Sequence, residues 1–307
     1  MSENMRPTPT LRQLRYLAAV VERCHFGHAA EDCLVSQSTL SAAIQELEDL
    51  LGAPLLERTK RSVVPTPLGR EIAGRARALL KGADDLVDIA LTARDPMAGP
   101  LHLGVIPTIG PFLLPNVMPR LRSAFPRLKL YLKEDQTARL LDQLDSGMLD
   151  AAIIALPYKL DDLEAMDLGP DAFSVICPPG HRLSHQRPVR PKDLAPEDLL
   201  LLEDGHCLRD HVLTACNMEI TRRNPAFQGT SLHTLVQMVA SGLGVTLVPH
   251  MALDAGILRG LDIEAIPLDE TAPPRRIGLV WRRGTARKET FETLGTMLRE
   301  ATAREGG

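Results

Sequence analysis

Hydrophobic positions near the start of the chain recur with the period of short helices. One helix is predicted over residues 11–21, a second over 27–33, and a third from Ser36, a typical N-cap, to Leu51 before Gly52. The third helix begins with small polar residues and places its leucines and isoleucine on the opposite face. This arrangement is typical of a helix-turn-helix, whose second helix enters the major groove of DNA.

Two short strands around a basic turn are predicted next, over residues 55–66. Residues 1–66 hold seven Lys or Arg against eight Asp or Glu, but the positive charge gathers at Arg58, Lys60 and Arg61, where a wing would contact phosphates. We expect bases or phosphates to be contacted from the third helix by Gln37, Ser38, Thr39 and Ser41. A three-helix bundle with a solvated turn and no DNA is the alternative.

A longer helix is predicted over residues 67–95. Thr66 supplies a capping hydroxyl and Pro67 suits the first helical position. Apolar residues then alternate at spacings of four and three, at Ile72, Ala76, Leu79, Ala83, Leu86, Ala90 and Ala93. This heptad seam indicates helix pairing between two chains, with packing on the chain's own body as the alternative. Residues 95–100 are predicted to break the helix and serve as a hinge.

The rest of the chain alternates between strands and helices. Strands are predicted at residues 101–106, 128–132, 151–156, 173–177, 245–248 and 277–281. This alternation predicts an α/β fold with helices on both faces of a sheet. We expect two lobes, about 100–168 with 275–307 and about 169–274, and a ligand in the cleft between them.

Composition and charge narrow the class of protein. The 307 residues are 44% hydrophobic but only 3% aromatic, so the core must be aliphatic, and the net charge of -4 does not suggest a generally basic nucleic-acid binder. Five cysteines at irregular spacing argue against a secreted disulfide framework. The polar start predicts no signal peptide, and we expect no membrane span and a reducing cytoplasm.

Cys207 and Cys216 are the most informative residues. Cys207 lies beside His206 and two residues before Arg209, a setting that can hold a thiolate at neutral pH. If the segment between the thiols is helical, they lie roughly 13 Å apart along its axis. A disulfide needs Cα atoms within about 7 Å, so this pair can bridge only if the local fold comes apart, which indicates a switch.

Several runs of residues together resemble a known family. The N-terminal part of the chain resembles the signature of LysR-type transcriptional regulators. The matching residues are Ala29-Ala30, Val35-Ser36-Gln37, Leu40-Ser41, Ile44, Leu47-Glu48, Leu51-Gly52, Leu55-Leu56, Arg58 and Thr66-Pro67-Leu68-Gly69. Further segments resemble the hydrogen-peroxide-sensing OxyR subfamily, at residues 105–111, 113–115, 143–147, 149–150 and 202–210. Cys216 stands at the spacing of that subfamily's resolving cysteine. Ser38 departs from the pattern, because the family usually has proline there.

The resemblance implies an architecture and a set of roles. It implies a winged helix-turn-helix (1–66), a dimerisation linker helix (67–95) and a two-lobed α/β regulatory domain (96–307) resembling periplasmic binding proteins. Cys207 would attack peroxide and form a sulfenic acid, and Cys216 would resolve it as a disulfide. The peroxide would be surrounded by Thr108, Thr137, His206 and Arg275, with Arg276 as the competitor for the arginine's role.

The implied partners are those of a regulator, not of an enzyme. They are double-stranded DNA, hydrogen peroxide, RNA polymerase, further copies in a homodimer or homotetramer, and a thiol reductant of glutaredoxin or thioredoxin type. No cofactor is expected. Cys24, Cys33 and Cys177 are expected to be small buried hydrophobes.

Three alternatives remain open. A metal could be bound by His206, Cys207, His211 and Cys216, although their spacing matches no tight metal-binding motif. A LysR-type regulator could instead respond to a small organic effector in the inter-lobe cleft, with Cys207 as a bystander. A thiol peroxidase is chemically conceivable, but it would leave the helix-turn-helix and the heptad helix without a purpose.

Overall fold

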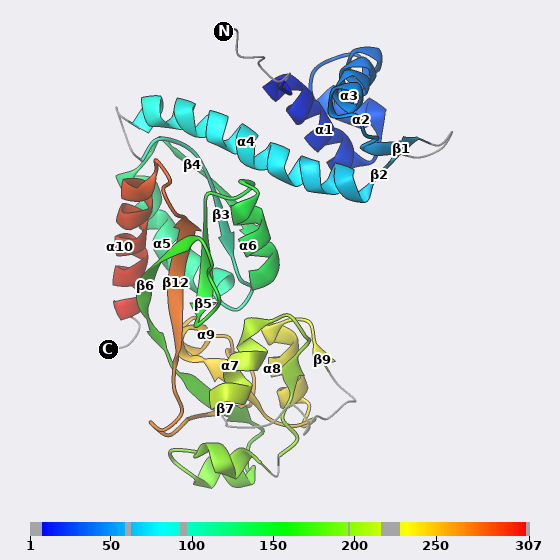
Figure 1. The fold of residues 1–307 in the computed structure, drawn as a ribbon. Helices are drawn as coiled ribbons and strands as arrows, with labels where there is room; N and C mark the ends of the chain where they lie inside the picture. Colours follow the sequence, from blue (N-terminus) through cyan, green and yellow to red (C-terminus); the bar gives the residue numbers. More distant parts are fainter. Residues whose placement is uncertain (1–7, 59–62, 93–96, 196, 216–227, 305–307) are drawn as a thin grey trace. The chain divides into compact units, whose positions relative to one another are not determined.

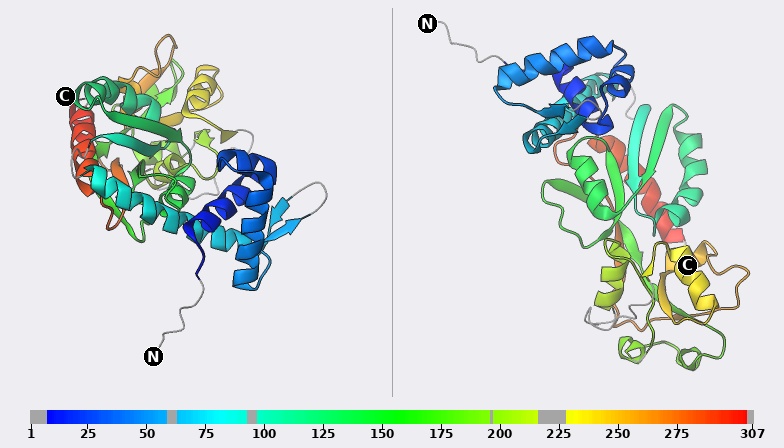
Figure 2. Two further views of the ribbon diagram at one scale, coloured as in Figure 1. Left: turned by 90° about the horizontal axis from the view of Figure 1, so that it is seen from above. Right: turned by 90° about the vertical axis from the view of Figure 1, so that its right-hand side faces the viewer.

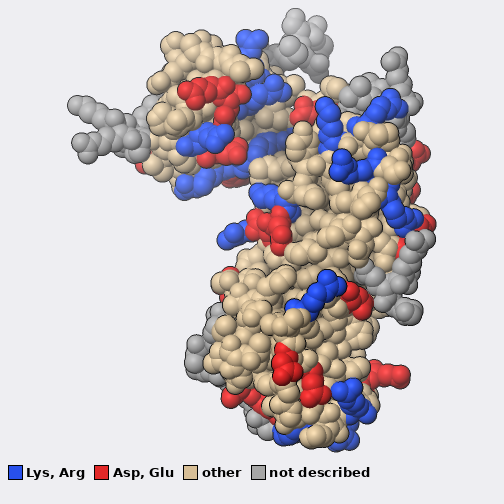
Figure 3. Space-filling model, turned by 180° about the vertical axis from the view of Figure 1, so that it is seen from behind, with Lys and Arg blue, Asp and Glu red and all other residues tan. Residues whose placement is uncertain are grey.

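The computed structural model describes residues 8–58, 63–92, 97–195, 197–215 and 228–304. They form two compact units, one of residues 1–90 with 145–148 and the other of the remaining residues. None of the described helices is long and apolar enough to cross a membrane. On the face seen in Figure 3, basic and acidic side chains are interspersed, as the small net charge leads one to expect.

The first unit is a winged helix-turn-helix followed by one long helix (Figure 1). Its elements are α1 (Leu11–Arg23), α2 (Phe26–Asp32), α3 (Gln37–Leu51), β1 (Leu56–Arg58), β2 (Val63–Pro65) and α4 (Pro67–Thr92). The strands β1 and β2 pair antiparallel and form the predicted wing. Leu17, Leu40 and Ile44 are fully buried, so an aliphatic core holds α1 and α3 together.

The helix boundaries in this unit follow local capping signals. Ser36 Oγ accepts a hydrogen bond from the Thr39 amide at 3.1 Å, and α3 ends at Gly52 in the left-handed region with φ +67°. Thr66 Oγ1 accepts from the Gly69 amide at 2.9 Å at the start of α4. The predicted N-caps and the predicted end of α3 are therefore confirmed.

A buried carboxylate connects α3 to the wing. Glu48 is 8% exposed, and its Oε1 accepts hydrogen bonds from the amides of Leu55 and Leu56 at 2.8 and 3.0 Å. Hydrogen bonds from two amides compensate for the burial of this charged group. Glu48 thereby fixes the point at which the chain leaves the turn and enters β1.

The predicted heptad seam on α4 changes from buried to exposed along the helix. Ala76 is buried, whereas Leu79 and Leu86 are 60% and 69% exposed. Several large exposed leucines on one helix are unusual in a monomer, and a second helix packed against them would cover them. Pairing between chains stays a prediction, and Ala90 and Ala93 of the seam lie outside the described side chains.

The second unit has two lobes, of which the first is built on a five-stranded sheet. Its strands follow the order β4-β3-β5-β12-β6, with β3 parallel to β4 and β5, and with β12 antiparallel to β5 and β6. The elements are β3 (Gly99–Val105), α5 (Gly110–Ala124), β4 (Leu128–Glu134), α6 (Thr137–Asp145), β5 (Ala151–Leu156), β6 (Leu163–Asp171), β12 (Arg275–Arg282) and α10 (Lys288–Arg304). Figure 1 shows α10 and α6 on opposite sides of this sheet.

The second lobe, coloured green, yellow and orange in Figure 2, is built on a three-stranded sheet in which β7 lies between β10 and β11. Its elements are β7 (Phe173–Cys177), the 3-10 helices η1 (Arg182–His185) and η2 (Pro191–Leu194), β8 (Leu201–Leu202), α7 (Cys207–Ala215), β9 (Gln228–Gly229), α8 (Leu232–Ala240), β10 (Thr246–Pro249), α9 (His250–Asp254) and β11 (Glu264–Pro267). The chain enters this lobe after β6 and returns at the start of β12. One continuous cluster of buried hydrophobic residues, most of them aliphatic, spans both lobes.

All six predicted strands are present, but β6, β8, β9 and β11 were not predicted. In β6, Asp167, Gly169 and Pro170 interrupt the apolar pattern, and the strand lies at the edge of its sheet. Edge strands tolerate such residues because one side of their backbone needs no partner strand. β8 and β9 are only two residues long, too short for a periodic signal, and β11 contains Glu, Ala and Pro, which are depleted in strands.

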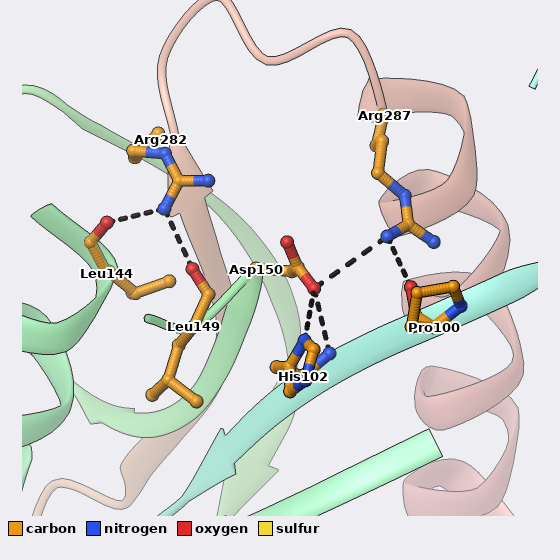
Figure 4. A network of polar contacts seen from close by, with 7 residues as sticks. All are labelled: Pro100, His102, Leu144, Leu149, Asp150, Arg282 and Arg287. Carbon is orange, nitrogen blue, oxygen red and sulfur yellow. Dashed lines mark hydrogen bonds and ion pairs between the residues drawn. The ribbon is translucent and has the colours of Figure 1, made fainter. Parts of the chain in front are cut away.

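A polar network fastens the sheet at the end where β3 and β5 begin (Figure 4). The Asp150 carboxylate accepts a hydrogen bond from the His102 amide at 2.8 Å and lies 3.7 Å from Nη1 of Arg287. Arg282 donates to the carbonyls of Leu144 and Leu149, on either side of a turn. The opposite end of these parallel strands is therefore left for a ligand, as is usual in α/β sheets.

Candidate functional site

A small pocket between the two lobes surrounds Cys207. It has a cavity volume of about 10 Å³, or about 180 Å³ of empty space with its open mouth included, and is lined by Ile106, Pro107, Thr108, Gln136, Thr137, Gly205, His206, Cys207 and Leu208. The lining segments lie at or next to the N-terminal ends of α5, α6 and α7. Helix N-termini favour negative charge, so the pocket suits an anion that forms there.

Cys207 is the first residue of α7 and reaches from the second lobe into the first. The residue is 8% exposed, and its thiol lies near the Thr137 hydroxyl of α6 and the backbone of Ala155 in β5. Among the described residues, the buried Thr137 hydroxyl has no hydrogen-bond partner, so it is available to bind a ligand in the pocket. The Cys207 side chain thus forms part of the contact between the lobes.

Arg275 is the cation of the site, and it is held by two partners. Its side chain is fully buried, its Nε and Nη2 donate to Asp171 Oδ2 at 3.0 and 2.8 Å, and its Nη1 donates to Thr108 Oγ1 at 2.9 Å. Arg276 instead is exposed and pairs with Asp167. Of the two arginines, Arg275 is the one whose charge acts on Cys207.

The structure corrects the expectation of a thiolate at neutral pH. Burial raises the pKa of Cys207, and the opposing effects of the Thr137 hydroxyl, the Arg275 charge and the Ala155 backbone do not outweigh it. The neighbours in sequence contribute less than expected, because Arg209 pairs with Asp204. In this closed arrangement the neutral thiol is favoured.

His206 lies where the resemblance implied, in the wall of the pocket. It is 8% exposed, and its Nε2 lies 3.7 Å from Oε1 of Glu203. Together with Thr108, Thr137 and Cys207 it brings four of the predicted residues to one pocket. Arg275 joins them through its hydrogen bond to the Thr108 hydroxyl.

Two features of the site have no signal in the sequence alone. Asp171, the last residue of β6, holds Arg275 from a position 104 residues away. Gly205 has φ +95°, and a Cβ there would lie 2.8 Å from Oε1 of Gln136. The glycine therefore allows the turn before α7 to approach the first lobe closely.

The other cysteines differ from one another. Cys216 lies outside the described residues. Cys177 is buried, as expected, and burial raises its pKa to about 11. Cys33 is half-buried, with its pKa also raised by burial. The expectation for Cys24 is wrong, because this residue is exposed at the C-terminal end of α1 with φ +48°.

The described residues contain no group of three or more His, Cys, Asp or Glu arranged to hold a metal ion. The four-residue metal site that was one alternative includes Cys216 and therefore lies partly outside them. The polar side chains that line the pocket beside the thiol are Thr108, Gln136, Thr137 and His206, and among these four the histidine is the one usual metal ligand.

The predicted DNA contacts lie at the exposed N-terminal end of α3. Gln37, Ser38 and Thr39 are exposed, and Ser41 is half-buried. The hydroxyls of Ser38 and Thr39 lie 2.9 and 2.8 Å from Ser36 Oγ, so they are partly engaged in the cap. The wing contacts lie outside what is described: Lys60 and Arg61 entirely, and Arg58 in its side chain.

Comparison with known proteins gives two family matches. Residues 11–70 match the bacterial regulatory helix-turn-helix protein, lysR family, and residues 94–303 match the LysR substrate binding domain. The chain is 38% identical over 299 residues to the HTH-type transcriptional regulator EstR of Acinetobacter baylyi, covering 97% of this chain and 99% of that one. It is 42% identical over 289 residues to the DNA-binding transcriptional dual regulator OxyR of Escherichia coli, covering 94% of each.

A solved structure agrees with these matches. A full-length OxyR variant from Pseudomonas aeruginosa superposes with a TM-score of 0.81 at 36% identity, covering 95% of each chain. The similarity therefore extends over both units of the chain and is not confined to the helix-turn-helix.

Proposed function

Because this chain belongs to the LysR family of bacterial transcriptional regulators, we propose that it is a DNA-binding regulator that senses hydrogen peroxide through the Cys207 thiol. The observation that carries the proposal is the position of Cys207, at a helix N-terminus in a small pocket with hydroxyls and a buried arginine around it. The OxyR relatives support the same function for a chain of this length and organisation.

The chemistry is a nucleophilic displacement on the O–O bond. Cys207 loses its proton, the thiolate attacks one peroxide oxygen, and the other oxygen leaves as hydroxide and takes up a proton to become water. The product is a sulfenic acid at Cys207. The Thr137 hydroxyl and the Arg275 charge favour the thiolate, and the Thr108 hydroxyl is placed to orient a peroxide oxygen.

Cys216 would then condense with the sulfenic acid to form a disulfide and release water. Since α7 is helical from Cys207 to Ala215, the two thiols do not meet while this helix is intact. Formation of the disulfide would therefore pull Cys207 out of the first lobe and unwind α7. Such a rearrangement between lobes is a bistable element of the kind that switches regulators.

A small organic effector is the second candidate, because EstR, a relative of similar identity, carries no mention of peroxide in its name. The pocket argues against it. Its cavity volume of about 10 Å³ is far below the roughly 300–1,000 Å³ of typical sites for organic ligands. Hydrogen peroxide has only two heavy atoms and is the smaller of the two candidate ligands.

The remaining assignments complete the proposal. Residues 1–66 would bind a roughly palindromic DNA site with half-sites about one helical turn apart, and the linker helix over 67–95 would pair two chains. Homodimers or homotetramers would contact RNA polymerase in the cytoplasm, and a glutaredoxin or thioredoxin would reduce the disulfide. The chain would act as a regulator without enzymatic turnover.

Peptide mass mapping after stoichiometric peroxide tests the proposal. We expect one disulfide between Cys207 and Cys216, a stable sulfenic or over-oxidised Cys207 in Cys216→Ser, and no response in Cys207→Ser. Cys177→Ser is the matched control, since this buried thiol should be dispensable. A reporter that still answered peroxide in Cys207→Ser would refute the mechanism, and sustained turnover with a reductant would favour a thiol peroxidase.

A further inference from the structure

His211 lies one helical turn after Cys207, so the two side chains share a face of α7. The ring is half-buried where the lobes meet: the backbone of Pro157, just after β5, contacts it, and Arg275 of β12 is close enough to act on its charge. Its Nδ1 is buried and has no hydrogen-bond partner among the described residues. The proposed peroxide chemistry makes no use of this ring.

The groups that face the ring decide its charge. Burial lowers the pKa of His211, and the Arg275 guanidinium lowers it further, whereas Asp210 and the Pro157 backbone oppose these effects without reversing them. Cys207 is the other titratable group on this face of α7, and Asp171 lies behind Arg275, to which it is hydrogen-bonded. The ring is therefore neutral in the docked arrangement, in which Cys207 is buried against the first lobe.

We propose that His211 is a positioning residue whose neutral ring holds α7 against the first lobe, and that proton uptake by this ring releases the segment that carries Cys207. The inference rests on the proposed function, because it assigns a control to the same thiol. A released histidine faces water and regains its ordinary pKa of about 6.5. Release therefore takes up a proton as the pH falls through about 6.5, and acid favours release.

Release also governs the second chemical step. The sulfenic acid at Cys207 condenses with the Cys216 thiol only after Cys207 has left the first lobe, and this condensation expels one water. Disulfide formation also needs the Cys216 thiolate, whose fraction falls about tenfold for each pH unit below the ordinary thiol pKa of about 8.5. Because this loss opposes the gain from release, the release of α7 is measured separately from the disulfide step.

Opening of α7 is measured without peroxide, in the reduced full-length protein. The probe is a neutral aromatic disulfide, and mass mapping identifies the modified peptide. The rate at which the probe modifies Cys207 at each pH is divided by the rate in the denatured chain, which removes the ordinary pH dependence of the thiol. The normalised rate should rise about tenfold between roughly pH 7.5 and pH 5.5, the limit for one proton with a released pKa near 6.5. His211→Gln, neutral throughout, should give a flat profile.

His211→Lys supplies the opposite test, because it keeps a positive charge beside Arg275 and should leave Cys207 quickly modified at every pH. His185→Gln, in η1 of the second lobe, should keep the wild-type profile. A flat wild-type profile, or a rise that persists in His211→Gln, would overturn the inference. His211→Asn is the neutral variant to use if His211→Gln does not fold.

Failure of the proposed function would look different. A Cys207 that peroxide does not oxidise, with the pH profile and its loss in His211→Gln intact, would refute peroxide sensing and leave the role of His211 standing. A normal disulfide after peroxide, with no difference between wild type and His211→Gln at any pH, would refute the role of His211 alone.

Discussion

Replacing Asp171 by asparagine should destabilise the regulatory domain. Asp171 Oδ2 accepts two hydrogen bonds from Arg275, and both side chains are 3% exposed or less. Asparagine retains an oxygen for the Met251 amide, which now donates to Oδ1 at 3.0 Å, but it turns an NH₂ group toward the guanidinium. Leaving a buried charge without its partner costs about 3–5 kcal/mol, which for a domain of this size lowers Tm by on the order of 10 °C.

The same substitution should make the Cys207 thiol more acidic. Without the carboxylate, the positive charge of Arg275 is uncompensated and favours the thiolate, so the pKa of Cys207 should fall relative to wild type. The assay is the pH dependence of Cys207 alkylation, mapped by mass, beside a thermal melt. Asp167→Asn, at the exposed pair with Arg276, is the control and should cost at most about 1 kcal/mol. A Tm equal to that of the control, with an unchanged or raised pKa, would refute the reasoning.

Three further substitutions test other parts of the structure. Thr108→Val removes a pocket hydroxyl that accepts a hydrogen bond from Arg275, and it should slow sulfenic acid formation about tenfold in stopped-flow measurements. An unchanged rate would show that this hydroxyl takes no part in the reaction. Gly205→Ala should push the turn before α7 away from Gln136 and speed the alkylation of Cys207. Gly180→Ala is the control: Gly180 has φ +70° and nothing within 4 Å of an added Cβ, so this change should only lower stability by about 1 kcal/mol. Equal rates of Cys207 alkylation in both variants would contradict the close approach at Gly205. Leu86→Glu should shift the protein to smaller species in sedimentation, and an unchanged assembly would argue against the pairing helix.

Local signals explain why the first unit was predicted well. The caps at Ser36 and Thr66 join groups three residues apart, and the end of α3 depends on a single glycine. Such interactions join residues that are close in sequence, so local sequence patterns predict them. The hydrogen bonds of the buried Glu48 carboxylate, whose partners lie seven and eight residues away, were not predicted.

The chemistry of the site was harder to predict, because it depends on distant residues and on burial. Arg275 and Asp171 are separated by 104 residues, and resemblance supplied only the arginine. The acidity of Cys207 was misjudged because Arg209, near in sequence, pairs with Asp204, while the cation that acts on the sulfur is Arg275 of the distant strand β12. Cys24 was expected to be buried because free cysteines usually are, but it follows α1 in an exposed turn.

The raised pKa of Cys207 bears on which oxidants the site would accept. A buried neutral thiol is a weak nucleophile, so it reacts slowly with an oxidant that only collides with the surface of the domain. The groups that favour the thiolate, the Thr137 hydroxyl and Arg275, lie inside a pocket too small for organic ligands of ordinary size. A two-oxygen molecule that enters it meets the thiol and its activating groups together, and the helix N-termini around the pocket favour the negative charge that develops as the O–O bond breaks. Burial suppresses the thiolate and at the same time restricts the thiol to small oxidants such as peroxide. Under the proposed mechanism, α7 would also have to open before Cys216 could react with the oxidised Cys207.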